Sequence, residues 1–118
     1  MSISISDVLL HIRDELSFLH RDSVEITEEY FFTDRKTLNA YVRSFEIIGE
    51  ACKSLPETFR KKYPQIDWKG FAGFRDILIH QYFGIDKQIV WDTIKTEVPE
   101  MLGELERIIS IEQELLGE

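Results

Sequence analysis

The chain contains 118 residues, of which 43% are hydrophobic and 31% are charged, and its formal net charge is −8. This composition excludes an intrinsically disordered protein, and no stretch approaches the roughly 20 consecutive apolar residues of a membrane span. A chain of this length can bury a core of its own, so we expect one domain over residues 1–118. The N-terminus lacks the pattern of a secretory signal and the only cysteine is Cys52, so we expect a cytoplasmic protein.

Positive charge is concentrated in residues 51–75, which contain six Lys or Arg and two acidic side chains, a net charge of +4 in an otherwise acidic chain. The overall negative charge argues against broad, sequence-independent binding of nucleic acids. The local excess allows two interpretations that charge alone does not separate. It forms either a solvated basic turn or a surface that attracts an anion beside a nearby site.

The N-terminal segment is predicted to be an amphipathic helix. Ser4 or Ser6 can cap its start. His11 and His20 have no His, Cys or carboxylate partner at metal-binding spacing, so we expect them at the surface or its boundary. The apolar residues recur at spacings of 4, 3, 4 and 3, which is one stripe of an α-helix: Ile5, Leu9, Ile12, Leu16 and Leu19.

A short helical turn after Thr27 is followed by three aromatic residues, 30–32, which we expect in the core. A second long helix is predicted from Thr33 or Asp34 to the residue before Pro56, because proline disfavours helix in the residue before it. Gly49 lies inside this helix at a cost of ~1 kcal/mol relative to alanine, which indicates close packing against another helix. Glu50 either faces solvent or pairs with a buried arginine, and the pattern slightly favours solvent.

The rest of the chain also predicts helices. A short basic turn spans residues 56–64, and a third main helix is predicted over residues 68–83, with Asp67 as its N-cap and Gly84 closing it. The last helical region starts after Asp86, and Pro99 marks either a kink or a new helix start. Period-two alternation, phosphate-binding loops and paired-cysteine metal motifs are all absent from the sequence. We therefore predict an all-α fold, an antiparallel bundle of four or five helices.

Residues 71–83 contain the side chains that are best suited to catalysis. On a regular helix of 100° per residue, the residues that we assign to the core face are Phe71, Phe74, Ile77 and Leu78. The opposite face carries Arg75, Asp76, Ile79, His80 and Tyr82.

Two relationships on this helix matter for function. Asp76 and His80 are i,i+4 neighbours and can form a hydrogen bond. Arg75 and His80 point in different directions, so a site built from both requires the helix to unwind near Gly84 or a second copy to supply the other half. The apolar Ile79 on this polar face indicates that the face is covered, as it would be in a symmetric dimer. The plain alternative is that both side chains are solvated or form local ion pairs.

The segment Arg75–Asp76–x3–His80 resembles the Arg-x4-6-His signature of HEPN domains, in which the residue after the arginine is most often Asn. The longer form RDILIHQY, which ends at Tyr82, is similar to the signature of HepT-like toxins. The likeness includes IIGEA upstream and Trp91 and Pro99 downstream, and it covers roughly residues 5–116.

The resemblance implies an all-α homodimer that acts as a metal-independent endoribonuclease without a cofactor. It implies that Arg75 and His80 are catalytic, that Asp76 supports His80, and that a minimal nucleotidyltransferase antitoxin transfers AMP to Tyr82. Asp76 departs from the usual Asn, and its charge would repel an RNA phosphate. The cations that would guide RNA are Arg60, Lys61, Lys62 and Lys69.

Two other functions remain open. The chain could be a non-catalytic helical adaptor that binds a nucleotidyltransferase and presents Tyr82 to it. It could also be a plain helical interaction domain. An RNase assay separates both from the toxin, because only the toxin cleaves RNA.

Overall fold

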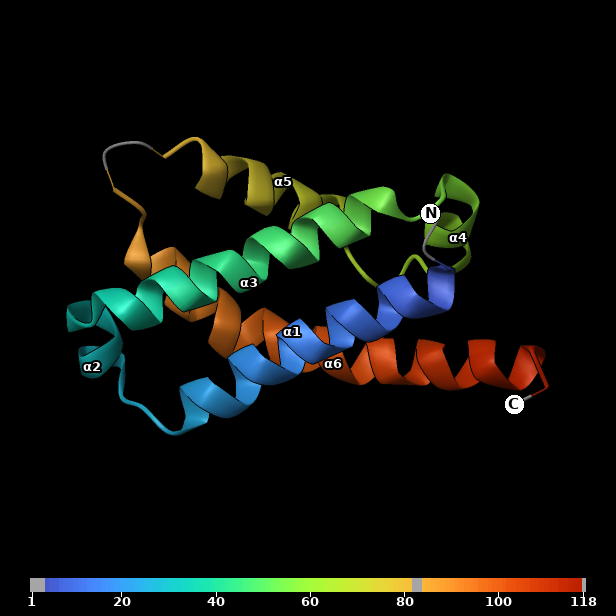
Figure 1. The fold of residues 1–118 in the computed structure, drawn as a ribbon, viewed down its shortest axis with the longest axis horizontal. Helices are drawn as coiled ribbons and strands as arrows, with labels where there is room; N and C mark the ends of the chain where they lie inside the picture. Colours follow the sequence, from blue (N-terminus) through green and yellow to red (C-terminus); the bar gives the residue numbers. More distant parts are fainter. Residues whose placement is uncertain (1–3, 82–83, 118) are drawn as a thin grey trace.

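The structure is a computed structural model that describes residues 4–81 and 84–117. The helices in this part of the chain are α1 (Ile5–Val24), α2 (Glu28–Thr33), α3 (Arg35–Ser54), α4 (Glu57–Lys62), α5 (Trp68–Ile79) and α6 (Lys87–Leu115). Four of them are long and form the bundle, while α2 and α4 are short and lie at its two ends (Figure 1). The predicted all-α bundle is confirmed.

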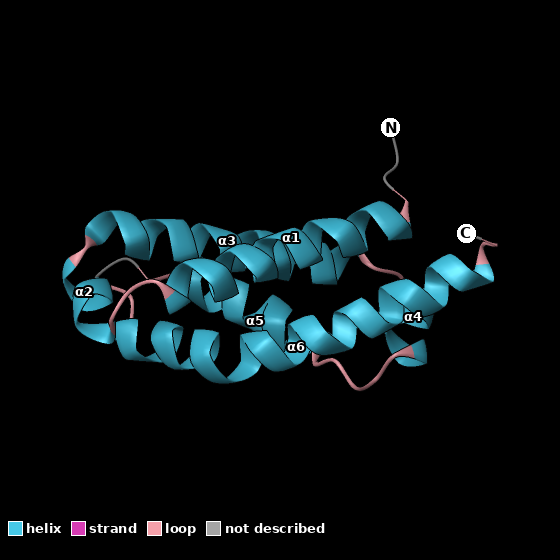
Figure 2. Ribbon diagram, turned by 90° about the horizontal axis from the view of Figure 1, so that it is seen from below, coloured by secondary structure: helices cyan, strands magenta, loops and turns pink. Residues whose placement is uncertain are grey.

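Neighbouring long helices run antiparallel. α3 packs against α1 on one side and α5 on the other, and α1 also packs along α6. Figure 2 shows α6 along the lower side of the bundle, opposite α1 and α3. No helix in the described residues is both long and apolar enough to span a membrane.

The helices begin where side chains can cap them. The predicted caps are confirmed at Ser4, Asp67 and Asp86, whose side chains each accept a hydrogen bond from a backbone N–H in the first turn of α1, α5 and α6. These bonds satisfy donors that a helix leaves without an intrahelical partner. Pro99 lies inside α6, which continues through it as one helix.

The core is built from the apolar stripes of the helices. Four of the five predicted stripe residues of α1 are at most 1% exposed, whereas Ile5 is 37% exposed. Phe31 from α2 is fully buried, and its ring centroid lies 5.5 Å from that of Tyr41 and 5.1 Å from that of Trp91. This aromatic cluster joins α2, α3 and α6 at one end of the bundle, and α3 in turn packs against α5.

Candidate functional site

The helix that carries the motif is shorter than predicted. α5 ends at Ile79 instead of residue 83, and His80 follows as its C-cap with φ −95° and ψ 6°. The N–H of His80 is shared between the carbonyl oxygens of Asp76 and Ile77, at 3.3 and 3.2 Å, which closes the last turn. Gly84 has a positive φ of 134°, but it lies beyond this end and does not cap the helix.

Arg75 lies at the contact between α5 and α3, and not on a face opposite the core as the helical wheel suggested. A Cβ atom placed on Gly49 of α3 would lie 2.2 Å from the Cβ of Arg75, so the base of the arginine side chain touches the α3 backbone. The close packing predicted at Gly49 is confirmed. The Arg75 side chain is 28% exposed, which leaves its far end accessible.

The carboxylate of Asp76 pairs with Arg75 and not with His80. Its Oδ1 lies 3.0 Å from Nη1 of Arg75. The buried Nε of Arg75 has no hydrogen-bond partner in the described part of the chain. One side of the guanidinium is therefore dry and the other is held by a carboxylate.

His80 is oriented by the main chain. Its Nδ1 lies 2.8 Å from the carbonyl oxygen of Asp76. A carbonyl oxygen only accepts hydrogen bonds, so this contact favours the tautomer with the proton on Nδ1 and the lone pair on Nε2. The His80 side chain is exposed, so Nε2 is available to a substrate.

A single chain does not join the two predicted catalytic residues. Among the described side chains, no hydrogen bond or ion pair links Arg75 to His80; Arg75 binds the Asp76 carboxylate and His80 the Asp76 carbonyl. Because the backbone from Arg75 to His80 keeps helical hydrogen bonds, the two side chains still diverge as on a regular helix. Tyr82, the expected modification site, lies outside the residues that the structure describes, as does Phe83.

A groove between α5 and α6 corrects the assignment of Ile77 to the core. Ile77 is 56% exposed and lines a groove of about 530 Å³ together with Ile89 of α6, which is 51% exposed. Its apolar lining also includes Phe71, Phe74 and Met101, and its acidic lining is Asp67, Glu97, Glu100 and Glu104. Sequence reasoning missed this groove, although Gly73 lines it on the same side of α5 as Ile77, and a Cβ placed on Gly73 would meet nothing within 4 Å.

The cations predicted to guide RNA differ in whether their charged ends already bind other groups of the chain. Lys61 pairs with Glu57 at 3.2 Å, Lys62 pairs with Glu112 at 2.9 Å, and Nε of Arg60 donates to a backbone carbonyl. Lys69 is exposed in the first turn of α5. α4, with the first three cations, lies at the opposite end of α5 from His80 (Figure 1), and α5 itself is ~18 Å long.

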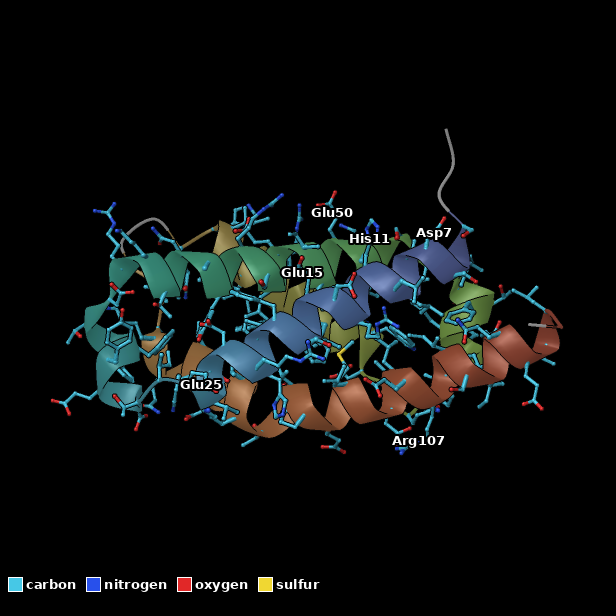
Figure 3. The ribbon with its side chains drawn as sticks, turned by 60° about the horizontal axis from the view of Figure 1, so that its bottom comes forward. Asp7, His11, Glu15, Glu25, Glu50 and Arg107 are labelled. Atoms are coloured by element: carbon cyan, nitrogen blue, oxygen red, sulfur yellow. The ribbon has the colours of Figure 1, made fainter. Side chains whose placement is uncertain are left out.

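Other candidate residues face solvent. Glu50 is exposed and extends away from the bundle in Figure 3, so it is not a buried partner of an arginine. His11 is exposed and His20 is half-buried, as expected. Cys52 is fully buried, and burial raises the pKa of its thiol to about 12, so this thiol stays protonated and is a packing residue.

Comparison with known proteins finds relatives whose names describe them as ribonucleases. A relative from Methanocaldococcus jannaschii, named "Putative RNase MJ0127", is 47% identical over 87% of this chain and 82% of its own. "Putative RNase TTE0752" of Caldanaerobacter subterraneus is 45% identical over 89% of this chain and 94% of its own. "Probable ribonuclease HepT" of Thermococcus cleftensis is 39% identical over 92% and 98%.

No solved structure gives a significant match to the chain. The model of the family described as "Ribonuclease HepT-like" matches residues 12–108, which include α2, α3, α4 and α5 completely, most of α1 and α6, and the whole Arg75–His80 segment. From this match and the identities of its relatives, the chain belongs to the HepT-like ribonuclease family.

Proposed function

We propose that the chain is the toxin of a toxin–antitoxin pair and that it cleaves RNA without a metal ion, at a composite site that a homodimer forms from Arg75 and His80. The proposal depends mainly on the exposure and the hydrogen bonding of the His80 imidazole. Its imidazole is exposed, and the bond from Nδ1 to the Asp76 carbonyl leaves Nε2 as a base. Membership in a ribonuclease family supports RNA as the substrate.

The chemistry requires no redox step. Nε2 of one neutral His80 takes the proton of a ribose 2′-OH, and the 2′-oxygen attacks the adjacent phosphorus. A protonated His80 from the second copy donates a proton to the departing 5′-oxygen, which leaves a 2′,3′-cyclic phosphate and a 5′-hydroxyl. General acid–base catalysis of this kind typically contributes 10²–10⁴-fold in rate, and histidine suits it because its pKa lies near neutrality.

Arg75 has the complementary role. Its guanidinium is always charged and presents planar N–H donors that fit phosphate oxygens, so it can stabilise the negative charge that develops on the pentavalent phosphorane. Asp76 holds Nη1 at 3.0 Å, and this carboxylate must yield part of that contact when RNA binds. Asp76 thus restrains the arginine and weakens the attraction of the site for RNA.

A second copy supplies what one chain lacks. Arg75 and His80 diverge within one chain, and α5 and the first turn of α6 carry exposed apolar side chains: Ile77, Ile79 and Ile89 are 56%, 39% and 51% exposed. Burying them against an identical surface would gain roughly 25 cal/mol per Å² of apolar area. The exposed Lys69 of α5 and the acidic side chains of α6 have opposite charges, which favours α5 of one copy lying against α6 of the other.

Tyr82 would be the point of control. It lies two residues after His80, so a minimal nucleotidyltransferase antitoxin that adds AMP to its hydroxyl would place bulk and a negative phosphodiester beside the site. Both effects oppose RNA binding, by steric exclusion and by charge repulsion.

Purified protein tests the proposal directly. We expect it to cleave RNA in the presence of EDTA and to leave 2′,3′-cyclic phosphate ends, and we expect His80→Ala and Arg75→Ala each to reduce cleavage at least ~100-fold. His11→Ala is the matched control, because His11 is exposed on α1 and should not affect the rate. Equal cleavage by wild type and both motif variants would refute the proposal, and no cleavage by any preparation would favour the adaptor function.

A further inference from the structure

α3 and α5 approach each other unusually closely at Gly49. A Cβ atom on this buried residue would lie 2.2 Å from the Cβ of Arg75 and 2.8 Å from the carbonyl oxygen of Phe71. Real Cβ atoms essentially never come within 3.0 Å of a heavy atom of a residue to which they are not covalently joined, and one of the two neighbours is backbone. Any side chain at position 49 would therefore push α5 away from α3 at the turn that carries Arg75.

The same contact determines how Arg75 is held. Its Cβ rests on Gly49, its Nε is buried without a partner in the described part of the chain, and its Nη1 binds Asp76. A buried donor without an acceptor is unfavourable, so a longer separation between α3 and α5 would allow water to reach Nε and the guanidinium to turn. The short separation at Gly49 keeps the stem dry and the charged end directed outwards.

We propose that Gly49 is a positioning residue for Arg75. The missing side chain at position 49 lets α5 approach α3 until the arginine stem is buried, and this fixes the direction from which the guanidinium meets an RNA phosphate. The inference rests on the proposed function for the role of Arg75, but it concerns a residue that touches no substrate. A pre-oriented arginine loses less conformational freedom when it binds, and a shift of about 1 Å can reduce a rate ~100-fold.

Gly103 provides a matched control. It lies inside α6, and a Cβ placed there meets nothing within 4 Å. Replacing a glycine in a helix interior by alanine normally stabilises the helix, so Gly103→Ala should raise the Tm. Gly49→Ala should lower it, because the clash with Arg75 and Phe71 outweighs the gain in helix propensity.

A binding measurement separates positioning from mere packing. RNA affinity is measured as a function of salt for His80→Ala, which binds without cleaving, and for the same variant with Gly49→Ala, Gly103→Ala or Arg75→Ala added. The slope of log K against log salt is negative, and loss of one phosphate contact to single-stranded RNA reduces its magnitude by ~0.7. We expect this loss with Gly49→Ala and with Arg75→Ala, and no change of slope with Gly103→Ala.

The outcomes distinguish this inference from the proposed function. If Arg75→Ala makes the salt slope shallower and a folded Gly49→Ala does not, Gly49 has no positioning role and the RNA site stands. If Arg75→Ala leaves the slope unchanged, Arg75 does not contact RNA and both ideas fail. If Gly49→Ala does not fold, hydrogen exchange in the wild type provides the test. The Nε hydrogen of Arg75 should exchange with solvent more slowly than that of Arg107, whose side chain is 66% exposed. Equal exchange rates would overturn the inference.

Discussion

The imidazole of His80 is bonded to the main chain of Asp76 and not to its side chain: Nδ1 lies 2.8 Å from the carbonyl oxygen, whereas the carboxylate lies 3.0 Å from Nη1 of Arg75. The orientation of the candidate base and the charge next to the candidate phosphate-binding arginine therefore have separate origins. A substitution of the residue 76 side chain can therefore change the charge next to Arg75 without changing the orientation of His80.

Asp76→Asn tests this separation. It retains the carbonyl that orients His80 and removes a negative charge beside Arg75, so we expect RNA to bind about fivefold more tightly, consistent with ~1 kcal/mol for one nearby charge at the surface. Cleavage at saturating RNA should stay within about threefold of wild type. Glu114→Gln loses a charged carboxylate at an exposed position near the end of α6 and should leave affinity unchanged. A large loss of cleavage in Asp76→Asn would show that the carboxylate itself supports His80.

Mixed dimers report how many histidines each site uses. If one His80 is the base and the other the acid, wild type mixed and re-equilibrated with His80→Ala should lose activity as the square of the wild-type fraction. A half-and-half mixture would then retain about a quarter of the activity per chain. A linear decrease to one half would mean that one histidine suffices for each site. Wild type alone, equilibrated at the wild-type concentration of each mixture, is the control for dilution.

Ile77 tests where the second copy binds. Ile77 is 56% exposed in the groove between α5 and α6, so Ile77→Asp should place a charge in the dimer interface and produce a folded monomer that does not cleave RNA. Ile111→Asp changes an isoleucine of α6 that is 44% exposed and does not line this groove, and it should remain dimeric. Light scattering measures the mass of both. A dimeric Ile77→Asp protein would remove the groove from the interface.

Glu112 should make the fold sensitive to acid. The hydroxyl of Tyr63 and the ammonium of Lys62 hold the pKa of Glu112 below its ordinary value, although desolvation opposes them. A carboxyl with a lowered pKa in the folded state stabilises the fold above its unfolded-state pKa of ~4.3, and this stabilisation is lost as the pH falls towards the folded-state pKa. Between pH 7 and pH 3, the Tm of wild type should therefore fall further than that of Glu112→Gln.

The contact also holds the basic turn against the end of α6, since Lys62 is the last residue of α4 and Tyr63 follows it directly. Glu114→Gln is again the matched control, and it should show the acid sensitivity of wild type. Equal losses of Tm in wild type and Glu112→Gln would contradict the assigned role of the Glu112 carboxylate.

Tyr82→Phe tests the proposed control by AMP. Co-expression with the nucleotidyltransferase from the adjacent reading frame should add one AMP unit to wild type, visible by intact-mass analysis, and abolish its cleavage of RNA. Tyr82→Phe should keep its mass and its activity in the same experiment. Tyr30→Phe, at a tyrosine of α2 that is 49% exposed, controls for other acceptors. Modification of Tyr82→Phe at another residue would reject Tyr82 as the acceptor.

Several features were determined by local sequence alone. The spacing of apolar residues predicted the long helices, because the periodicity of a helix is a property of the helix itself. Ser4, Asp67 and Asp86 marked helix starts for a similarly local reason, since a cap bonds to a donor only two or three residues away. Gly49 signalled close helix packing, and the Arg75–His80 segment indicated the family.

Only the tertiary structure decided how α5 is used. An apolar stripe shows that a helix has an inward side but not which neighbour covers it, so Ile77 was assigned to the core, whereas α5 lies against α3 and leaves Ile77 in an open groove. Arg75 looked free on the helical wheel, yet its stem is buried because α3 offers a glycine at that point. α5 ends at Ile79, where His80 bonds to the Asp76 carbonyl, although the sequence pattern predicted helix to residue 83. The spacing of apolar residues shows that a segment can be helical, whereas the neighbour that α5 packs against is α3, a segment distant in the sequence, which this spacing does not encode.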